Sequence, residues 1–94
     1  MADNGYSYAP NFVFPPGETL RELLEARQIR QVELAEKLDM SEKAISQLLN
    51  AKTSLTHETA LRLQRALGVR ASFWNNLEAR YQEYLARERE YQRL

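Results

Sequence analysis

The sequence predicts an all-α fold of five helices, with an extended N-terminal arm and a long C-terminal helix. Over most of the chain, apolar residues recur every three or four positions, which is the spacing that lines one face of a helix. Residues that favour helix ends interrupt this pattern, so we expect short turns between the helices. A chain of 94 residues is long enough for one domain with a modest core.

The first helix is predicted to start at Pro15-Pro16-Gly17, because proline is tolerated in a first helical turn. Leu20, Leu23 and Leu24 form its apolar stripe, and it should end near Gln28. The domain is therefore expected to cover residues 15–94.

Residues 1–14 precede this domain and are not helical by pattern. Tyr6 and Tyr8 lie two positions apart, as do Phe12 and Phe14, which is the spacing of an extended segment. Two interpretations remain open, a frayed terminus and an arm whose aromatic side packs on the domain or on a partner chain.

The second and third helices are predicted over residues 31–38 and 42–49. Asp39-Met40-Ser41 breaks the pattern between them, and Ser41 is a good N-cap for the third helix. The residues expected to point inward are Leu34, Ala35, Leu38, Ile45, Leu48 and Leu49.

The last two helices follow from capping residues in the same way. Thr56 is predicted to cap the fourth helix, which Gly68 ends. Ser72 is predicted to cap the fifth, over residues 72–94. We expect Phe73 to Leu77 to be core.

Composition excludes several classes of function. There are no cysteines, and His57 is the only histidine, so neither a metal site nor thiol catalysis is expected. No side chains pair as nucleophile and base, so we predict neither an enzyme nor a bound cofactor. No apolar run could span a membrane and no signal peptide is visible, which predicts a cytoplasmic protein without membrane contact.

The spacing of residues 31–50 is that of a helix-turn-helix. Two helices that cross steeply need a small residue where they touch, which is Ala35, and an apolar plug in the turn, which is Met40. The polar residues of the third helix then face outward from its N-terminus, the end that enters the major groove of DNA. The alternative is a helical bundle whose exposed face happens to be polar.

The candidate DNA-binding residues have different expected roles. Lys43 and Gln47 are predicted to read bases, with Glu42 and Ser46 as weaker candidates. Gln31 begins the second helix, whose free amides can bind a phosphate. The complete predicted set is Gln31, Ser41, Glu42, Lys43, Ser46, Gln47, Asn50 and Lys52.

Charge argues weakly against DNA binding, because 13 Lys and Arg balance 13 Asp and Glu. Residues 1–52 carry 6 basic and 8 acidic side chains, and residues 53–94 carry 7 and 5. Any contact with DNA must therefore rest on a few well-placed cations, with weak, salt-sensitive non-specific affinity.

Residues 14–85 resemble the HigA-type antitoxins, a group within the phage-repressor-like (XRE) helix-turn-helix family. The matching pieces are residues 16–20, 31–38, 46–50, 59–63, 66–68 and Phe73-Trp74-Asn75-Asn76-Leu77, of which the last is the most diagnostic. The resemblance implies a homodimer that represses transcription from a palindromic double-stranded operator, and often a small ribonuclease toxin as partner. Asp39 departs from the glycine of many relatives, although Asp tolerates the left-handed conformation well.

The far part of the last helix favours an interface. Tyr81, Tyr84 and Leu85 continue the line of apolar side chains along one face of this helix, here called the seam. They lie beyond what a small domain can cover, so we expect them to contact a dimer mate or another domain. A second class of function therefore stays open. In it the helix-turn-helix is a scaffold, and the chain neutralises a toxin or forms the N-terminal domain of a longer regulator.

Overall fold

The computed structural model describes residues 12–93, which fold into five helices without a strand. Of the predicted arm, residues 1–11 lie outside the described residues, and residues 12–14 are not helical. The helices are α1 (Pro16–Arg27), α2 (Gln31–Leu38), α3 (Glu42–Leu49), α4 (His57–Leu67) and α5 (Ala71–Arg93). The predicted all-α class and the order of the helices are confirmed.

Local chemistry sets most of the helix ends. The Ser41 hydroxyl accepts a hydrogen bond from the Ala44 amide at 3.0 Å, and the Thr56 hydroxyl accepts one from the Thr59 amide at 3.1 Å, as predicted for N-caps. Gly68 ends α4 at φ 78°, and Asp39 ends α2 at φ 56°. Both are left-handed C-caps, so Asp39 adopts the conformation for which many relatives were expected to use glycine.

The prediction that Ser72 caps the last helix is wrong, because α5 begins at Ala71. The Ala71 amide donates to Oε1 of Gln64 at 2.7 Å, so a side chain from α4 satisfies the first turn of α5. Phe73 is also not core, since 42% of it is exposed. Successive helical residues point about 100° apart, and Trp74, which is fully buried, takes the inward direction instead.

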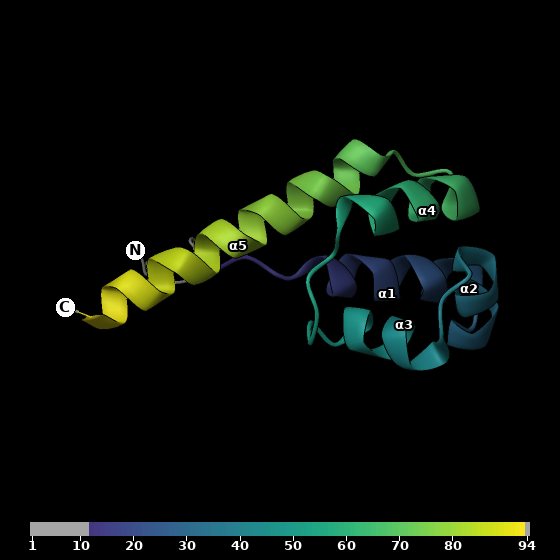
Figure 1. Cartoon of the computed structure of the whole chain (residues 1–94), viewed down its shortest axis with the longest axis horizontal. Coiled ribbons are helices and arrows are strands. Elements are labelled where there is room, and N and C mark those ends of the chain that lie inside the picture. Colours follow the sequence, from purple (N-terminus) through teal and green to yellow (C-terminus); the bar gives the residue numbers. More distant parts are fainter. Residues whose placement is uncertain (1–11, 94) are drawn as a thin grey trace, which may run out of the picture.

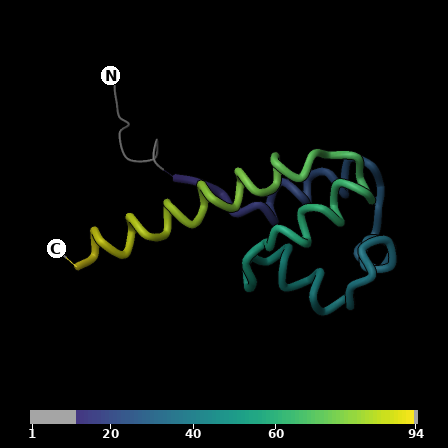
Figure 2. The backbone as a smooth tube through the Cα atoms, turned by 45° about the horizontal axis from the view of Figure 1, so that its top comes forward, coloured from purple at the N-terminus to yellow at the C-terminus, as the bar shows by residue number. Residues whose placement is uncertain are grey.

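Figure 1 shows α1 running between α3 on one side and α4 and α5 on the other. Helix α2 lies at one end of the molecule, opposite to the projecting end of α5 (Figure 1). Helix α5 leaves the body and continues well past it, as Figure 2 also shows. The long axis of the molecule is 46 Å, against 29 and 22 Å for the others, because of this projecting helix.

One core joins all five helices. Leu20, Leu34, Ile45, Leu63 and Trp74 are completely buried, one from each helix. No polar or charged residue of the described chain is buried with them. The inward residues predicted for α2 and α3 are all buried, and Ala35 is only 4% exposed where the two helices meet.

Helix α1 approaches α3 so closely that only glycine fits at the contact. A Cβ atom at Gly17 would lie 2.5 Å from the carbonyl oxygens of both Leu48 and Leu49. These atoms belong to the backbone at the C-terminal end of α3, so they cannot turn away as a flexible side chain could. Gly17 therefore sets how deeply α3 sits against α1.

We predict that Gly17→Ala destabilises the fold, although alanine favours a helix by about 1 kcal/mol over glycine. The added methyl group forces α1 and α3 apart, and overpacking of this kind typically costs about 1 to 3 kcal/mol. Thermal or urea unfolding measures the change. A variant that melted at or above the temperature of the parent would show that helix propensity outweighs the close contact.

Candidate nucleic-acid interface

Helix α3 presents a polar face that begins at its capped N-terminus. Ile45, Leu48 and Leu49 are buried on its inner side. Glu42 and Lys43 are exposed in its first turn, and Ser46 and Gln47 are partly exposed one turn later. The Ser41 hydroxyl oxygen accepts from the Ala44 amide, which leaves its O–H and a second lone pair for a ligand.

The C-terminal end of α3 carries a small hydrogen-bonded network. Nη2 of Arg21, on α1, donates to Oδ1 of Asn50 at 2.9 Å, and Nδ2 of Asn50 lies 3.4 Å from the Ser46 hydroxyl. The structure thus brings Ser46 and Asn50 together, and it adds Arg21, which sequence reasoning did not identify. Arg21 lies 29 residues from Asn50, so no local pattern connects the two.

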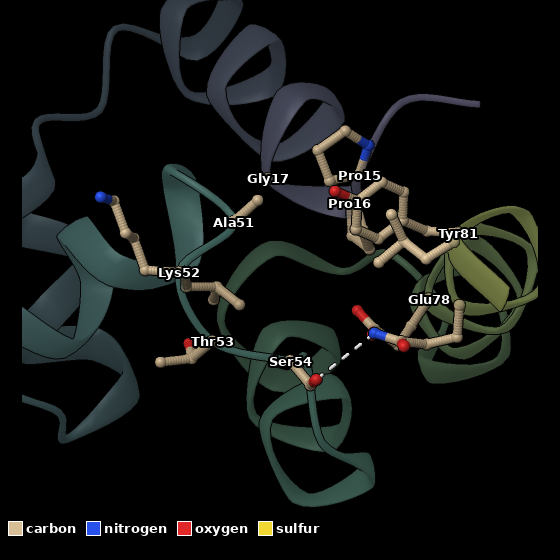
Figure 3. Close-up of a pocket in the computed structure, with 12 residues that line it drawn as sticks. Pro15, Pro16, Gly17, Ala51, Lys52, Thr53, Ser54, Glu78 and Tyr81 are labelled. Carbon is tan, nitrogen blue, oxygen red and sulfur yellow. Dashed lines mark hydrogen bonds between the residues drawn. The ribbon is translucent and has the colours of Figure 1, made fainter. Parts of the chain in front are cut away.

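Lys52 and Gln31 lie apart from this network. Lys52 is exposed in the turn after α3, where its amide donates to the Gln47 carbonyl at 2.8 Å. Figure 3 shows its side chain directed away from Glu78 and Tyr81 of α5. Gln31 begins α2, where the Glu33 carboxylate accepts the Arg30 amide at 2.8 Å. That carboxylate partly offsets the positive end of the helix dipole.

A second arginine fixes the turn between α2 and α3. Nη1 of Arg62, on α4, donates to the carbonyls of Leu38 at 2.8 Å and Asp39 at 3.2 Å. Its Nη2 pairs with Glu58 at 2.8 Å. The carbonyls at the C-terminal end of α2 thus accept hydrogen bonds from a charged donor. Through this contact α4 holds the turn from which α3 starts.

The predicted interface residues lie along the inner edge of the projecting part of α5. Tyr81, Tyr84 and Leu85 are each partly exposed. Phe12 packs edge-to-face on Tyr84 with ring centroids 5.4 Å apart, and on Phe14 at 4.8 Å. Phe12, in the segment before α1, thus packs on the domain, as one interpretation of the aromatic arm expected. The expected contact of Tyr81, Tyr84 and Leu85 with a dimer mate or another domain stays a prediction.

A cleft of about 180 Å³ opens beside this seam, between the start of α1, the turn after α3, and α5. Figure 3 shows Pro16 and Tyr81 on one side of it and Thr53 and Ser54 on the other. Glu78 ties the two sides together by accepting the Leu55 amide at 3.1 Å, and Gln82 bridges Glu78 to Ser54. Hydrogen bonds thus connect α5 to the turn after α3.

Neither a metal nor a membrane is suggested by the part of the chain that the structure describes. Across residues 12–93 no group of three or more His, Cys, Asp or Glu side chains is arranged to hold a metal ion. No helix in this range is long and apolar enough to cross a bilayer.

The arrangement of α2, turn and α3 on a five-helix core is that of a helix-turn-helix protein. Residues 20–74 match the helix-turn-helix family, and the chain belongs to it. The chain is 40% identical to virulence-associated protein A of Dichelobacter nodosus, over 70% of this chain and 67% of that protein. It is 38% identical to the uncharacterised HTH-type transcriptional regulator YbaQ of Escherichia coli, over 68% of this chain but only 58% of YbaQ.

Solved structures of HigA antitoxins share the fold over most of the chain. The HigA-family antidote protein of Coxiella burnetii superimposes with a TM-score of 0.77 at 31% identity, covering 85% of this chain and 88% of that one. The Pseudomonas aeruginosa antitoxin HigA, solved with the higBA promoter, gives a TM-score of 0.81 at 28% identity and covers 87% and 90%. The predicted resemblance to HigA-type antitoxins is confirmed.

We predict that Arg62→Met weakens the fold while keeping the apolar stem of the side chain. The substitution leaves the Leu38 and Asp39 carbonyls without their charged donor, and hydrogen bonds to charged groups are worth about 1.5 to 3 kcal/mol. Thermal unfolding measures the loss. Arg65→Met, at an exposed position on the same helix, is the control, and equal effects of the two substitutions would contradict the role of Arg62.

Proposed function

We propose that the protein is a sequence-specific DNA-binding transcriptional repressor, the antitoxin of a toxin–antitoxin system. The observation that carries this proposal is the polar face of α3, which starts at a capped helix N-terminus beside a fixed turn. The similarity to HigA structures supports it, among them the one that contains promoter DNA. A Pseudomonas aeruginosa protein in complex with its 18-base-pair operator also shares the fold, with a TM-score of 0.81.

We assign the base-reading role to Lys43 and Gln47. Both project from the first two turns of α3, and their long side chains match the acceptors and donors that base pairs display in the major groove. Glu42 could accept from cytosine N4 but is repelled by phosphate, so it favours a restricted set of bases. Asn50, Lys52 and the amides at Gln31 serve the DNA backbone, which positions the protein without selecting sequence.

We propose that two copies bind the two halves of a palindromic operator. One helix-turn-helix reads only a few base pairs, and pairing two across sites about 34 Å apart multiplies the selectivity. In this proposal residues 15–94 form the domain and residues 1–14 the arm. Tyr81, Tyr84 and Leu85 supply the contact between copies, since the same patch is buried on both chains of a two-fold dimer.

A second candidate function rests on the same seam of α5. The aromatic rings of Phe12, Tyr81 and Tyr84 cluster beside the cleft on a helix that projects from the body. Such a surface also suits a toxin or a further domain of a longer regulator. A gel shift with the gene's own upstream DNA separates the two functions, because a scaffold without DNA binding leaves the duplex unshifted.

We predict that the double variant Lys43→Ala/Gln47→Ala loses specific binding to this upstream duplex. Replacing Gln47 alone should cost about 1 to 3 kcal/mol and relax base preference at one position. Fluorescence anisotropy with a labelled duplex measures both effects. Lys37→Ala/Gln92→Ala removes the same two side-chain types from exposed positions on α2 and α5 and is expected to bind normally. Normal binding by a folded Lys43→Ala/Gln47→Ala variant would rule out α3 as the reading helix.

We predict that Tyr81→Glu/Leu85→Glu weakens self-association by about tenfold or more, because each copy would bury charges in an apolar contact. Sedimentation equilibrium without DNA measures the dimer dissociation constant. Ala79→Glu/Ala86→Glu adds the same two charges at exposed positions of α5 and should dimerise like the parent. A parent that stays monomeric at high micromolar concentration, or a dimer that tolerates both charges, would defeat this assignment.

A further inference from the structure

We propose that Arg21, which lies on α1 outside the helix-turn-helix, binds a phosphate of the operator backbone, and that Asn50 holds it in position. This inference rests on the proposed DNA-binding function and adds a contact to it. The observation behind it is the network of Arg21, Asn50 and Ser46 at the C-terminal end of α3.

The network has a fixed direction, because an arginine side chain carries donors only. Arg21 can therefore meet Asn50 only through the carboxamide oxygen, which turns Nδ2 toward the Ser46 hydroxyl oxygen. Ser46 accepts from Asn50, so its own O–H is free to donate elsewhere. The N–H and O–H groups that this side-chain network leaves for a ligand are donors, one of them charged, and the ligand that suits such a cluster is an anion.

Arg21 reaches α3 in preference to acidic residues on its own helix. Glu18 and Glu25 lie three positions before it and four after it, where side chains on a helix are neighbours. Yet within residues 12–93 Arg21 forms no ion pair, whereas Arg30 and Arg62 each pair with a glutamate. Its one side-chain hydrogen bond in this range goes to Asn50, which leaves most of its N–H groups for a ligand.

The position of the network fits a backbone contact. A helix rises about 1.5 Å per residue, so the eight residues of α3 span roughly 12 Å. The major groove is also about 12 Å wide. When the first turn of α3 faces base edges, its C-terminal end lies at the level of the phosphates beside the groove. Gly17, one turn before Arg21, keeps α1 close enough to α3 for Arg21 to reach that end.

A purely structural role for Arg21 is the competing explanation, because a cation also stabilises the negative end of a helix. The two roles differ in their dependence on salt. Each phosphate that a protein neutralises adds about 0.9 to the slope of log affinity against log salt concentration. A residue that only orients Asn50 changes the affinity but leaves that slope unchanged.

The test is the salt dependence of binding to the gene's upstream duplex, with a scrambled duplex of the same length beside it. Arg21→Gln is expected to lower the slope by about 0.9 for each bound protomer and to weaken both duplexes by a similar factor. Arg21→Lys should keep the slope, since it keeps the charge. Arg70→Ala, which removes one charge from the exposed residue before α5, should change neither the slope nor the preference between duplexes.

Asn50→Ala completes the set, because it removes the positioning group without changing the charge. Weaker binding with an unchanged slope is expected for it. An unchanged slope in Arg21→Gln would overturn the proposal, whether or not affinity falls. The parent reports separately on the proposed function: if it binds neither duplex, DNA binding itself fails, whereas a parent that binds and an Arg21→Gln variant with the same slope reject only this phosphate contact.

Discussion

The contact between Gly17 and the last carbonyls of α3 is the constraint on which the polar face of α3 depends. A side chain at this position would meet two backbone oxygens at 2.5 Å, so the depth of α3 against α1 is set by the absence of a single methyl group. Two consequences follow from this depth. Leu48 and Leu49 are buried, which turns Ser46 and Gln47 toward solvent. Arg21, one turn further along α1, also comes within hydrogen-bonding distance of Asn50.

Side chains from distant helices hold the other junctions in a similar way. Arg62 on α4 donates to the end of α2, and Arg27 on α1 donates to the Leu67 carbonyl at the end of α4 at 2.7 Å. Gln64 accepts the first amide of α5. Free carbonyls and amides at helix ends are costly to leave unpaired, and each of these contacts satisfies one while joining two helices. The small apolar core is thus supplemented by polar ties at its edges.

Features that depend on neighbouring residues could be predicted from the sequence. The caps at Ser41 and Thr56 and the left-handed end at Gly68 depend on residues within a few positions, and the buried stripe of each helix follows from its own period. Features that depend on a partner far away in the sequence could not be predicted in this way. Ser72 has a good capping side chain, but Gln64 already supplies the acceptor, and α5 starts a residue earlier. Phe73 belongs to the aromatic run but faces outward, since only one of two neighbouring rings can point inward. Arg21 and Arg62 gave no signal, because their partners lie 29 and 24 residues away.

The chain has no net charge, and several of its cations already contact other groups of the protein. Arg27 and Arg62 donate to helix ends, and Arg30, Arg87 and Arg93 pair with glutamates. What the α3 face offers a polyanion is a short set, Arg21, Lys43 and Lys52, together with helix amides. So few charges give little affinity for DNA of arbitrary sequence. In the proposed repressor, discrimination then comes from the geometry of α3 and from the pairing of two copies, so the proposal needs the projecting seam of α5 as much as it needs the reading helix.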